Sequence, residues 1–464
     1  DAGRQRAPQP TTRKGPSMTK IAFMGAGSTV FAKNVLGDCL LTECLRDAQY
    51  ALYDIDHERL KESGMMLKNL NANLNGNRAE INTYLGVKNR RAALRNADFV
   101  INAIQVGGYE PSTVIDFEVP KKYNLRQTIG DTLGIGGIFR ALRTIPVLEG
   151  FARDVQAVCP NAWFLNYTNP VSILTGYLLH KFDVKAVGLC HSVQVCAEHL
   201  LRSLDLWEKY APVTWRIAGI NHMSWLLEIR KNNKDLYPEI RKAAEKTNRA
   251  ARKQGGEKHN DMVRFEILKH FGYYNTESSE HTAEYHPYFI KRLYPELVEE
   301  FNIPLDEYPR RCRVQIDNWR DQRDALVNNK KLTHARTNEY GSRIIEAITT
   351  DNPIEIGGNI LNRGLIDNLP SDAIVEVPCL VNRNGVQGCR VGALPLQCAA
   401  LNMTHINVHL LTIEAAATHS RSLVYQAAML DPRTRSELSL DDIRSLCDDL
   451  FEAHTRENML PEYT

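Results

Sequence analysis

The chain has 464 residues, of which 43% are hydrophobic and 24% are charged, and these values are ordinary for a globular protein with room for two or three domains. The formal net charge of +2 is too small to indicate binding to nucleic acid or to an anionic membrane. No apolar run reaches the roughly 18 residues that would cross a bilayer.

The cysteines and the first residues bear on where the protein works. Ten cysteines are scattered along the chain, and none of them forms a CxxC pair. A chain of this length does not need disulfides to stabilise it, so we expect a reducing, cytoplasmic setting. Residues 1–17 are polar, rich in Pro and Arg, and lack the apolar segment of a signal peptide. They predict a disordered tail or a tag remnant, with the natural start at Met18.

Strand-like runs alternate with helical segments in the first half of the chain. The helical pattern is clearest in "LKESGMMLKNLNANL" and "VSILTGYLLHKF", which carry apolar residues at three-to-four spacing. Such alternation is typical of a parallel, doubly wound α/β sheet, which binds ligands at the carboxyl ends of its strands. We therefore expect one such domain over residues 18–200. Its predicted strands are "KIAFMGAGS", "AQYALYDID", "ADFVINAIQVGG", "AWFLNYTNP" and "VKAVGLCHS".

The pattern changes beyond about residue 200. "RIAGINHMSWLLEIRKNNKDLY" predicts one or two strands, and the stretch from Tyr237 to about Lys330 is helical and highly charged. Later segments mix strand, as in "AIVEVPCLVN", with helix, as in "INVHLLTIEAAATHSRSLVYQAAML". No internal repeat or low-complexity linker separates the halves. We expect residues 201–464 to form an α+β domain that packs on the first, completes one active site and carries the oligomer contacts.

A nucleotide site is indicated after the first predicted strand. "GAGS" places Gly25, Gly27 and Ser28 where the backbone can turn sharply and approach a pyrophosphate at the start of a helix. The third small residue of the usual fingerprint is missing, because Val30 stands there. Asp54 ends the second strand, where a carboxylate can bind both ribose hydroxyls and favours NAD over NADP. Together these features predict a Rossmann-like NAD⁺ site, with an ordinary strand-to-helix turn as the alternative.

A thiol and an imidazole follow two other strand-like runs. Cys190, in "GLCHSVQ", follows "VKAVG", and His222, in "GINHMSW", follows "WRIAG". Thiolate and imidazole both suit a borderline divalent metal ion. Spacing alone does not decide for a metal, because a free cysteine is usually buried filler and a histidine beside Met and Trp is more often a satisfied core residue.

The order "GAGS", "YDID", "DTLGIGG", "NYTNP", "GLCHS" and "GINHM" resembles glycoside hydrolase family 4, and the resemblance runs from Met18 to the C-terminus. This NAD-dependent family is an exception to the usual glycosidases with two carboxylates. "CHS" and "ESSEHTAEYHPYF" look like its branch that acts on non-phosphorylated α-galactosides such as melibiose. The resemblance implies α-galactosidase activity, NAD⁺ and Mn²⁺ as cofactors, and a homodimer or homotetramer.

The resemblance also implies roles for individual residues. Cys190 and His222 match the metal ligands, and Tyr285, in "AEYHP", matches the catalytic base. Without the family, Tyr285 would pass for a tyrosine of the core or of a cleft wall. His191 occupies the position of the catalytic acid, which is Asp in some relatives.

Further positions are expected around the two ligands. Asn169, in "NYTNP", matches a substrate-binding asparagine, although it could instead form a turn before Pro170. Asp131, in "DTLGIGG", is expected near the sugar or as a brace of the glycine-rich loop. Gln105 and Asn166 lie in strand-end loops, where we expect the nicotinamide.

The implied reaction is an oxidation followed by an elimination. NAD⁺ takes hydride from C3 of the sugar, and the resulting ketone makes the C2 proton more acidic. The metal stabilises the enediolate, and it lowers the pKa of Tyr285 from about 10 so that this residue can remove the proton. The glycosidic oxygen leaves C1 with a proton from His191, water adds, and NADH returns the hydride.

Other functions remain as alternatives. A lactate- or malate-type dehydrogenase shares the two-domain plan, and Arg140 and Arg143, in "DTLGIGGIFRALRT", would suit its carboxylate clamp, but it needs no metal. A non-catalytic NAD-sensing protein would tolerate the loss of Tyr285 and His222. Within the family, α-glucosidase, α-glucuronidase and α-galacturonidase activities stay open.

Overall fold

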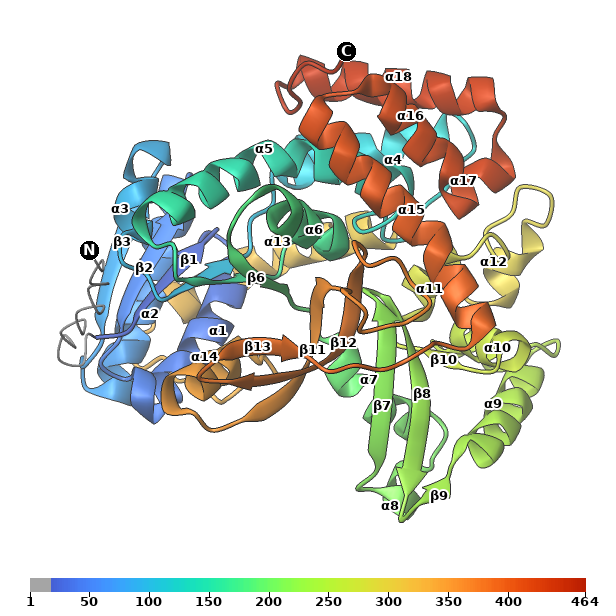
Figure 1. Cartoon of the computed structure of the whole chain (residues 1–464), viewed down its shortest axis with the longest axis horizontal. Helices are drawn as coiled ribbons and strands as arrows, with labels where there is room; N and C mark the ends of the chain where they lie inside the picture. The colour runs from blue at the N-terminus through green and yellow to red at the C-terminus, as the bar shows by residue number, and fades with distance from the viewer. Residues whose placement is uncertain (1–17) are drawn as a thin grey trace, which may run out of the picture.

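One mixed sheet runs through most of the protein (Figure 1). The computed structural model describes residues 18–464, so the predicted tail, residues 1–17, lies outside the described residues. The strands lie in the order β10-β8-β7-β12-β11-β6-β5-β4-β1-β2-β3, with β13 beside β12 and β9 beside β8. The strands are β1 (Lys20–Met24), β2 (Gln49–Asp54), β3 (Glu80–Leu85), β4 (Phe99–Asn102), β5 (Trp163–Asn166), β6 (Lys185–Gly188), β7 (Thr214–Ile220), β8 (Met223–Lys231), β9 (Lys234–Asp235), β10 (Tyr274–Asn275), β11 (Ile354–Leu361), β12 (Ile374–Asn382) and β13 (Gly385–Gly388).

The strands from β6 to β3 pair in parallel. Their order reverses at β1, because the chain first moves outward through β2 and β3 and then returns to β4, β5 and β6 on the other side. This is the doubly wound Rossmann order, so the predicted fold class is confirmed. The sequence prediction missed β3, an edge strand in which buried and half-buried residues alternate with exposed ones and which therefore lacks a continuous apolar run.

Successive side chains of β1 enter two different cores. Ile21 and Phe23 pack in the core that α1 and α2 cover, whereas Ala22 and Met24 pack in the core that α5 and α6 cover. The alternation arises because neighbouring side chains of a strand point to opposite faces of the sheet. Since both faces are buried, the strand reads as an uninterrupted apolar run, which made it easy to predict.

The second half of the chain extends the same sheet. β11 runs antiparallel to β6, with Asn359 opposite Gly188, and β12, β7, β8 and β10 follow. A Cβ at Gly188 would lie 2.5 Å from Val171 Cγ1 and 2.9 Å from Asn359 Cβ, so only glycine allows this close approach. The join places the end of β6 next to elements from residues 354–382, far away in the sequence.

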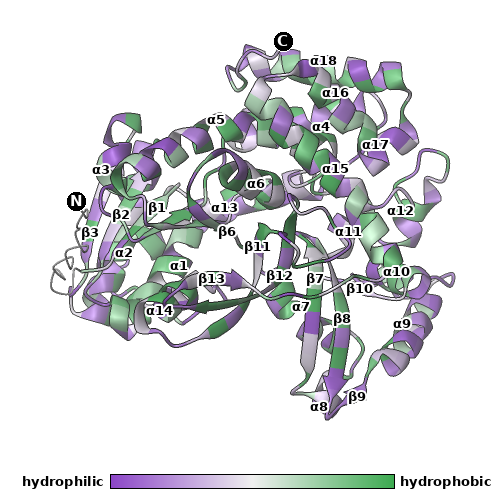
Figure 2. Ribbon diagram, in the orientation of Figure 1, coloured by the Kyte–Doolittle hydropathy of each residue, from purple (hydrophilic) through white to green (hydrophobic). Residues whose placement is uncertain are grey.

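Helices cover both faces of the sheet and form a cap at its upper edge in Figure 1, built from α4 and α15 to α18. Figure 2 shows α6, which lies between the sheet and α15, as largely hydrophobic and the outlying α9 as largely hydrophilic. The segment predicted as helix near the C-terminus forms two helices, because His419 adopts a left-handed conformation (φ 52°) between α15 and α16. Among the described helices, none has the length and apolar character needed to cross a membrane.

Helices connect the strands along the whole described chain. Those of the first half are α1 (Thr29–Leu41), α2 (His57–Asn75), α3 (Arg90–Leu94), α4 (Val114–Lys121), α5 (Gly134–Val158), α6 (Val171–Lys181), α7 (Ser192–Ser203) and α8 (Trp207–Tyr210), with short helical turns at Glu43–Leu45, Val87–Asn89 and Gly108–Thr113. Those of the second half are α9 (Tyr237–Ala251), α10 (Met262–Phe271), α11 (Ser279–Tyr285), α12 (Glu296–Glu300), α13 (Glu307–Val327), α14 (Gly341–Thr350), α15 (Leu396–Thr418), α16 (Arg421–Leu430), α17 (Pro432–Glu437) and α18 (Leu440–Arg456).

Candidate active site

The residues predicted to bind a nucleotide meet at the carboxyl ends of β1 and β2. Gly25 has φ +90°, and a Cβ there would lie 2.8 Å from the carbonyl oxygen of Ala103, so this turn needs glycine. The backbone N–H of Gly27 donates to Asp54 Oδ2 at 2.6 Å, and Ser28 stands exposed at the start of α1. The geometry therefore brings the glycine turn and the acid together.

The position of Val30 explains why this chain tolerates the lack of the third small residue in the nucleotide-binding fingerprint. The third small residue of that motif normally permits close packing of the helix against the strand. Val30 is 48% exposed and so points away from the buried face of α1. A larger side chain at this position therefore costs no packing against the sheet.

The two residues predicted beside the nicotinamide lie in different surroundings. Gln105 follows β4, is exposed, and donates from Nε2 to Thr113 Oγ1 at 3.4 Å. Asn166 ends β5 and is fully buried. It accepts from Asn102 Nδ2 at 3.0 Å and donates to the carbonyl oxygen of Thr168 at 3.2 Å. The Asn166 side chain therefore holds strand ends together, and its contact with the cofactor stays a prediction.

Three potential metal ligands come together at the join between the two halves of the sheet. Cys190 follows β6, His222 lies in the turn between β7 and β8, and Glu277 precedes α11. Their ligand atoms all lie within 4.8 Å of one another. Glu277 Oε2 is 3.9 Å from Cys190 Sγ and 3.5 Å from His222 Nε2. The structure thus unites the two predicted ligands and adds a carboxylate that was not assigned from the sequence.

The local backbone and charges suit a cation at this cluster. His222 has φ +61°, an uncommon conformation for a residue other than glycine that often accompanies a functional site. Burial would lower the pKa of His222, but Cys190 and Glu277 raise it to about 10. Burial would raise the pKa of Glu277, but His222 and His281 lower it to about 2. The buried thiol and imidazole and the half-buried carboxylate form a donor set that fits a divalent metal, and they could hold one.

Tyr285 ends α11 beside this cluster. It is 1% exposed, and its ring centroid is 6.4 Å from that of His222. Within the described chain, its buried hydroxyl has no hydrogen-bond partner, so it is available to a ligand. Burial, followed by the charges of Asp131 and Glu277, raises the pKa of Tyr285 well above its usual value. Tyr285 can therefore act as a base only when positive charge lies beside it.

His191 lies at the start of α7, directly after Cys190. Its Nε2 is 2.6 Å from Glu339 Oε2, a carboxylate from a distant loop, and 45% of its side chain is exposed. The hydrogen bond that His191 donates to Glu339 raises the pKa of His191. The position of His191 and the direction of its pKa shift therefore suit a proton donor.

Two predicted substrate-binding residues are joined by a hydrogen bond. Asn169 Nδ2 donates to Asp131 Oδ2 at 3.1 Å, and Thr132 Oγ1 donates to Asp131 Oδ1 at 2.8 Å. Burial acts to raise the pKa of Asp131, but the charges of Arg140 and His281 hold it below its usual value. The pair therefore presents a carboxylate and an amide side by side, which suits the recognition of sugar hydroxyls.

His281 lies between Asp131 and the cluster of Cys190, His222 and Glu277. Its Nε2 is 4.0 Å from Asp131 Oδ1, its Nδ1 is 3.9 Å from Glu277 Oε1, and its ring centroid is 4.6 Å from that of His222. The sequence prediction assigned no role to Glu277, His281 or Glu339. Glu277 and His281 are four residues apart in "ESSEH", and this spacing on a predicted helix could have indicated one shared face.

Comparison with known proteins identifies the family of this chain. Residues 20–206 match the family 4 glycosyl hydrolase, and residues 217–434 match the family 4 glycosyl hydrolase C-terminal domain. The chain belongs to this family. It is 60% identical over 446 residues to an alpha-galactosidase of Bacillus subtilis, covering 96% of this chain and 100% of the relative. The predicted family is therefore confirmed.

Solved structures of glucosidases and of a dehydrogenase share the fold. A Bacillus subtilis protein provisionally assigned as a glucosidase is 27% identical, with a TM-score of 0.83 over 93% of this chain and 99% of that one. A 6-phospho-alpha-glucosidase from gut microorganisms, in complex with NAD and Mn²⁺, is 22% identical, with a TM-score of 0.76 over 97% of this chain and all of that one. A malate dehydrogenase of Cryptosporidium parvum, 15% identical, shares the two-domain plan with a TM-score of 0.51 over 86% of this chain and 99% of that one.

The two arginines that would suit a dehydrogenase have protein partners in this family 4 chain. Arg143 is buried and forms two hydrogen bonds with the carboxylate of Asp116, at 3.0 and 2.6 Å. Arg140 donates to the carbonyl oxygen of Asn169 and to the hydroxyl of Tyr308, at 3.2 Å each. Arg143 is therefore part of the core, and a clamp of two arginines for a hydroxy acid does not form.

Proposed function

We propose that the protein is an α-galactosidase that hydrolyses α-D-galactosides such as melibiose and depends on NAD⁺ and a divalent metal, with Mn²⁺ the expected ion. The identity with the Bacillus subtilis alpha-galactosidase supports the sugar. The single observation that carries the proposal is the Cys190, His222 and Glu277 cluster, which lies beside the unpartnered hydroxyl of Tyr285. A simple two-carboxylate glycosidase would need neither the thiol nor the glycine turn at β1.

The proposed binding roles follow from the positions of the residues. Cys190, His222 and Glu277 would hold the metal, and the glycine turn with Asp54 would bind NAD⁺. When bound, NAD⁺ would accept and return a hydride at C3 of the sugar, and the metal would stabilise negative charge on the sugar oxygens. The neighbouring Asp131 and Asn169 would orient the sugar through its hydroxyls.

Two residues would move protons. Tyr285 would remove the C2 proton, because its hydroxyl makes no hydrogen bond to residues 18–464 and is free to face a substrate. Its deprotonated form is costly in this buried site unless a cation offsets the nearby Asp131 and Glu277. His191 would protonate the glycosidic oxygen as it leaves C1, since its side chain is partly exposed.

The proposal extends to the setting and the organisation of the protein. Residues 18–200 would bind NAD⁺, and residues 201–464 would supply His222, Glu277 and Tyr285, so that the active site needs both domains. A thiol ligand must stay reduced, and all ten cysteines are free, which supports a reducing, cytoplasmic compartment. A homodimer or homotetramer stays a prediction from the family.

The test is an omission experiment with protein that has been stripped of nucleotide and metal and kept reduced. Release of 4-nitrophenol from 4-nitrophenyl α-galactoside, and of galactose from melibiose, should require both NAD⁺ and Mn²⁺. The matched α-glucoside and α-galacturonide should be poorer substrates. Equal hydrolysis without NAD⁺ would contradict the proposed dependence, and a preference for either other sugar would contradict the proposed specificity.

A further inference from the structure

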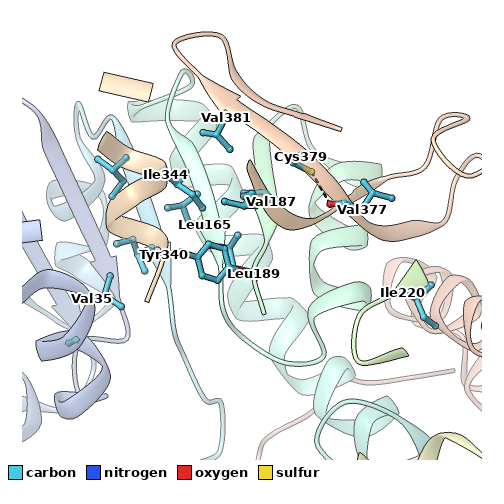
Figure 3. Close-up of a cluster of buried hydrophobic side chains, with 14 of the residues drawn as sticks. Val35, Leu165, Val187, Leu189, Ile220, Tyr340, Ile344, Val377, Cys379 and Val381 are labelled. Atoms are coloured by element: carbon cyan, nitrogen blue, oxygen red, sulfur yellow. Dashed lines mark hydrogen bonds between the residues drawn. The ribbon is translucent and has the colours of Figure 1, made fainter. Parts of the chain in front are cut away.

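Two adjacent residues of a distant loop hold the two adjacent residues at the end of β6. Tyr340 Oη accepts from the backbone N–H of Cys190 at 2.8 Å and donates to the carbonyl oxygen of the same residue at 2.9 Å. Glu339, the preceding residue, is bound to His191 Nε2. Figure 3 shows the Tyr340 ring beside Leu189, within the hydrophobic core. The loop therefore fixes both the backbone of the proposed metal ligand and the side chain of its neighbour.

The loop that carries Glu339 is itself anchored to the nucleotide-binding domain. Asp38, fully buried on α1, accepts hydrogen bonds from His334 Nε2 at 2.8 Å, from the backbone N–H of Thr337 at 2.9 Å and from Thr337 Oγ1 at 2.6 Å. The backbone N–H of Glu339 then donates to Thr337 Oγ1 at 3.1 Å. A Cβ at Gly37 would lie 2.7 Å from the His334 ring, so glycine makes room for this anchor. Since the anchor is buried and hydrogen-bonded, Glu339 has little freedom to move.

We propose that Glu339 is a positioning residue for His191, and that it selects the ring nitrogen that delivers a proton to the leaving group. This inference rests on the proposed function, in which His191 is the acid. A carboxylate only accepts hydrogen bonds, so His191 Nε2 must donate its proton to Glu339. Nδ1 is then the nitrogen that is left to face the glycosidic oxygen. A carboxylate that fixes one imidazole nitrogen in this way orients the other for proton transfer.

Water restores the proton that His191 gives to the leaving group. When the C1–O bond breaks, the glycosidic oxygen keeps the bonding electron pair and takes the Nδ1 proton, which leaves His191 neutral. When water later adds across the C1–C2 double bond, its hydroxyl forms the new C1–O bond, its remaining proton returns to Nδ1, and Tyr285 gives a proton back to C2. Glu339 keeps its hydrogen bond to Nε2 throughout and undergoes no net chemical change.

The dependence on the leaving group separates this role from a merely structural one. A sugar alkoxide, as in melibiose, is a poor leaving group and needs the proton, whereas 4-nitrophenolate leaves without help. A residue that only stabilised the fold would affect both substrates alike. A residue that positions the acid affects melibiose far more.

The experiment compares the holoenzyme, loaded with NAD⁺ and Mn²⁺, with the variant Glu339→Gln and the control Glu346→Gln on nearby α14. Glu339→Gln keeps the size of the side chain but removes the charge, so we expect kcat for melibiose to fall about 10–100-fold and kcat for 4-nitrophenyl α-galactoside to stay near wild type. Glu346→Gln should resemble wild type on both substrates. Thermal unfolding and Mn²⁺ binding of Glu339→Gln should match wild type.

Each other outcome overturns a distinct claim. Equal losses on the two substrates, or no loss on either, would overturn the positioning role while leaving the proposed function in place. Wild-type protein that hydrolyses neither α-galactoside would instead overturn the proposed function. If Glu339→Gln proves unstable, Glu339→Asp provides the test, because a shorter carboxylate retains the charge but not the reach and should again penalise melibiose selectively.

Discussion

The nucleotide edge and the catalytic site are built in different ways. The nucleotide edge uses Gly25, Gly27 and Asp54, which lie close together in the sequence and are joined through backbone geometry. The catalytic site uses buried and half-buried side chains that come from Asp131 through Glu339 and that meet where the antiparallel strands join β6. The first region is therefore a local motif, and the second exists only when both halves of the chain are folded together.

If this contrast holds, the substitution Cys190→Ser should cause the largest loss of activity. A serine hydroxyl stays protonated and binds a divalent metal poorly, so turnover should be lost. Mn²⁺ affinity should fall by more than the roughly 10–100-fold that is typical when a residue hydrogen-bonded to a metal ligand is replaced. NAD⁺ binding should survive, because the nucleotide edge is separate. Mn²⁺ binding by equilibrium dialysis and NAD⁺ binding by calorimetry measure this, with the exposed Cys44→Ser as control. A Ser variant that is fully active with bound Mn²⁺ would contradict the assignment.

The next largest effect should come from Tyr285→Phe. The change removes only the hydroxyl, so both NAD⁺ and Mn²⁺ should still bind, while kcat should fall about 10²–10⁴-fold, the usual contribution of a general base. Steady-state kinetics on 4-nitrophenyl α-galactoside measure the loss. Tyr288→Phe, at a tyrosine that is 47% exposed, is the matched control. Near-normal turnover of Tyr285→Phe would mean that another group removes the proton.

At the nucleotide edge we expect a smaller effect, in which NAD⁺ binding is weakened and Mn²⁺ binding is not. Asp54→Asn replaces a charged hydrogen-bond acceptor, which costs about 1.5–3 kcal/mol and should raise the Kd for NAD⁺ about 10–100-fold. Mn²⁺ affinity should not change, and kcat at saturating NAD⁺ should stay near wild type. Asp56→Asn is the control, since that carboxylate caps α2 two residues away. Unchanged NAD⁺ affinity in Asp54→Asn would place the ribose elsewhere.

The smallest effect concerns stability. Gly25→Ala should cost about 1–3 kcal/mol, because alanine at φ +90° is strained and its Cβ would lie 2.8 Å from the oxygen of Ala103. Gly76→Ala has a positive φ as well (+59°), but its Cβ would meet no atom within 4 Å, so it should cost less. Thermal unfolding compares the two variants. Equal shifts would mean that the close approach to Ala103 relaxes freely.

The same contrast explains what could be predicted from the sequence. The buried parallel strands and the glycine turn were predictable because apolar runs and tight turns are local signals. β3 was missed, since an exposed edge strand lacks that signal. Cys190 and His222 were only two of several possible core residues until the family resemblance joined them.

Glu277 and Glu339 show most clearly which site residues could not be predicted from the sequence. Glu277 reaches Cys190 across 87 positions of the chain, and Glu339 reaches His191 across 148. The local spacing of Glu277 and His281 could show only a shared face, and no local pattern shows which distant residue either carboxylate contacts. Their identification needed the join between β6 and β11, which sets the two halves of the chain side by side.

The most direct test of the central claim is the reaction of reduced, stripped protein with 4-nitrophenyl α-galactoside in D₂O, with NAD⁺ and Mn²⁺ present or omitted in turn. Oxidation at C3 and proton removal at C2 predict released galactose that carries deuterium at C2, formed only when both cofactors are present. Galactose without deuterium at C2, or hydrolysis that continues without NAD⁺, would contradict the account.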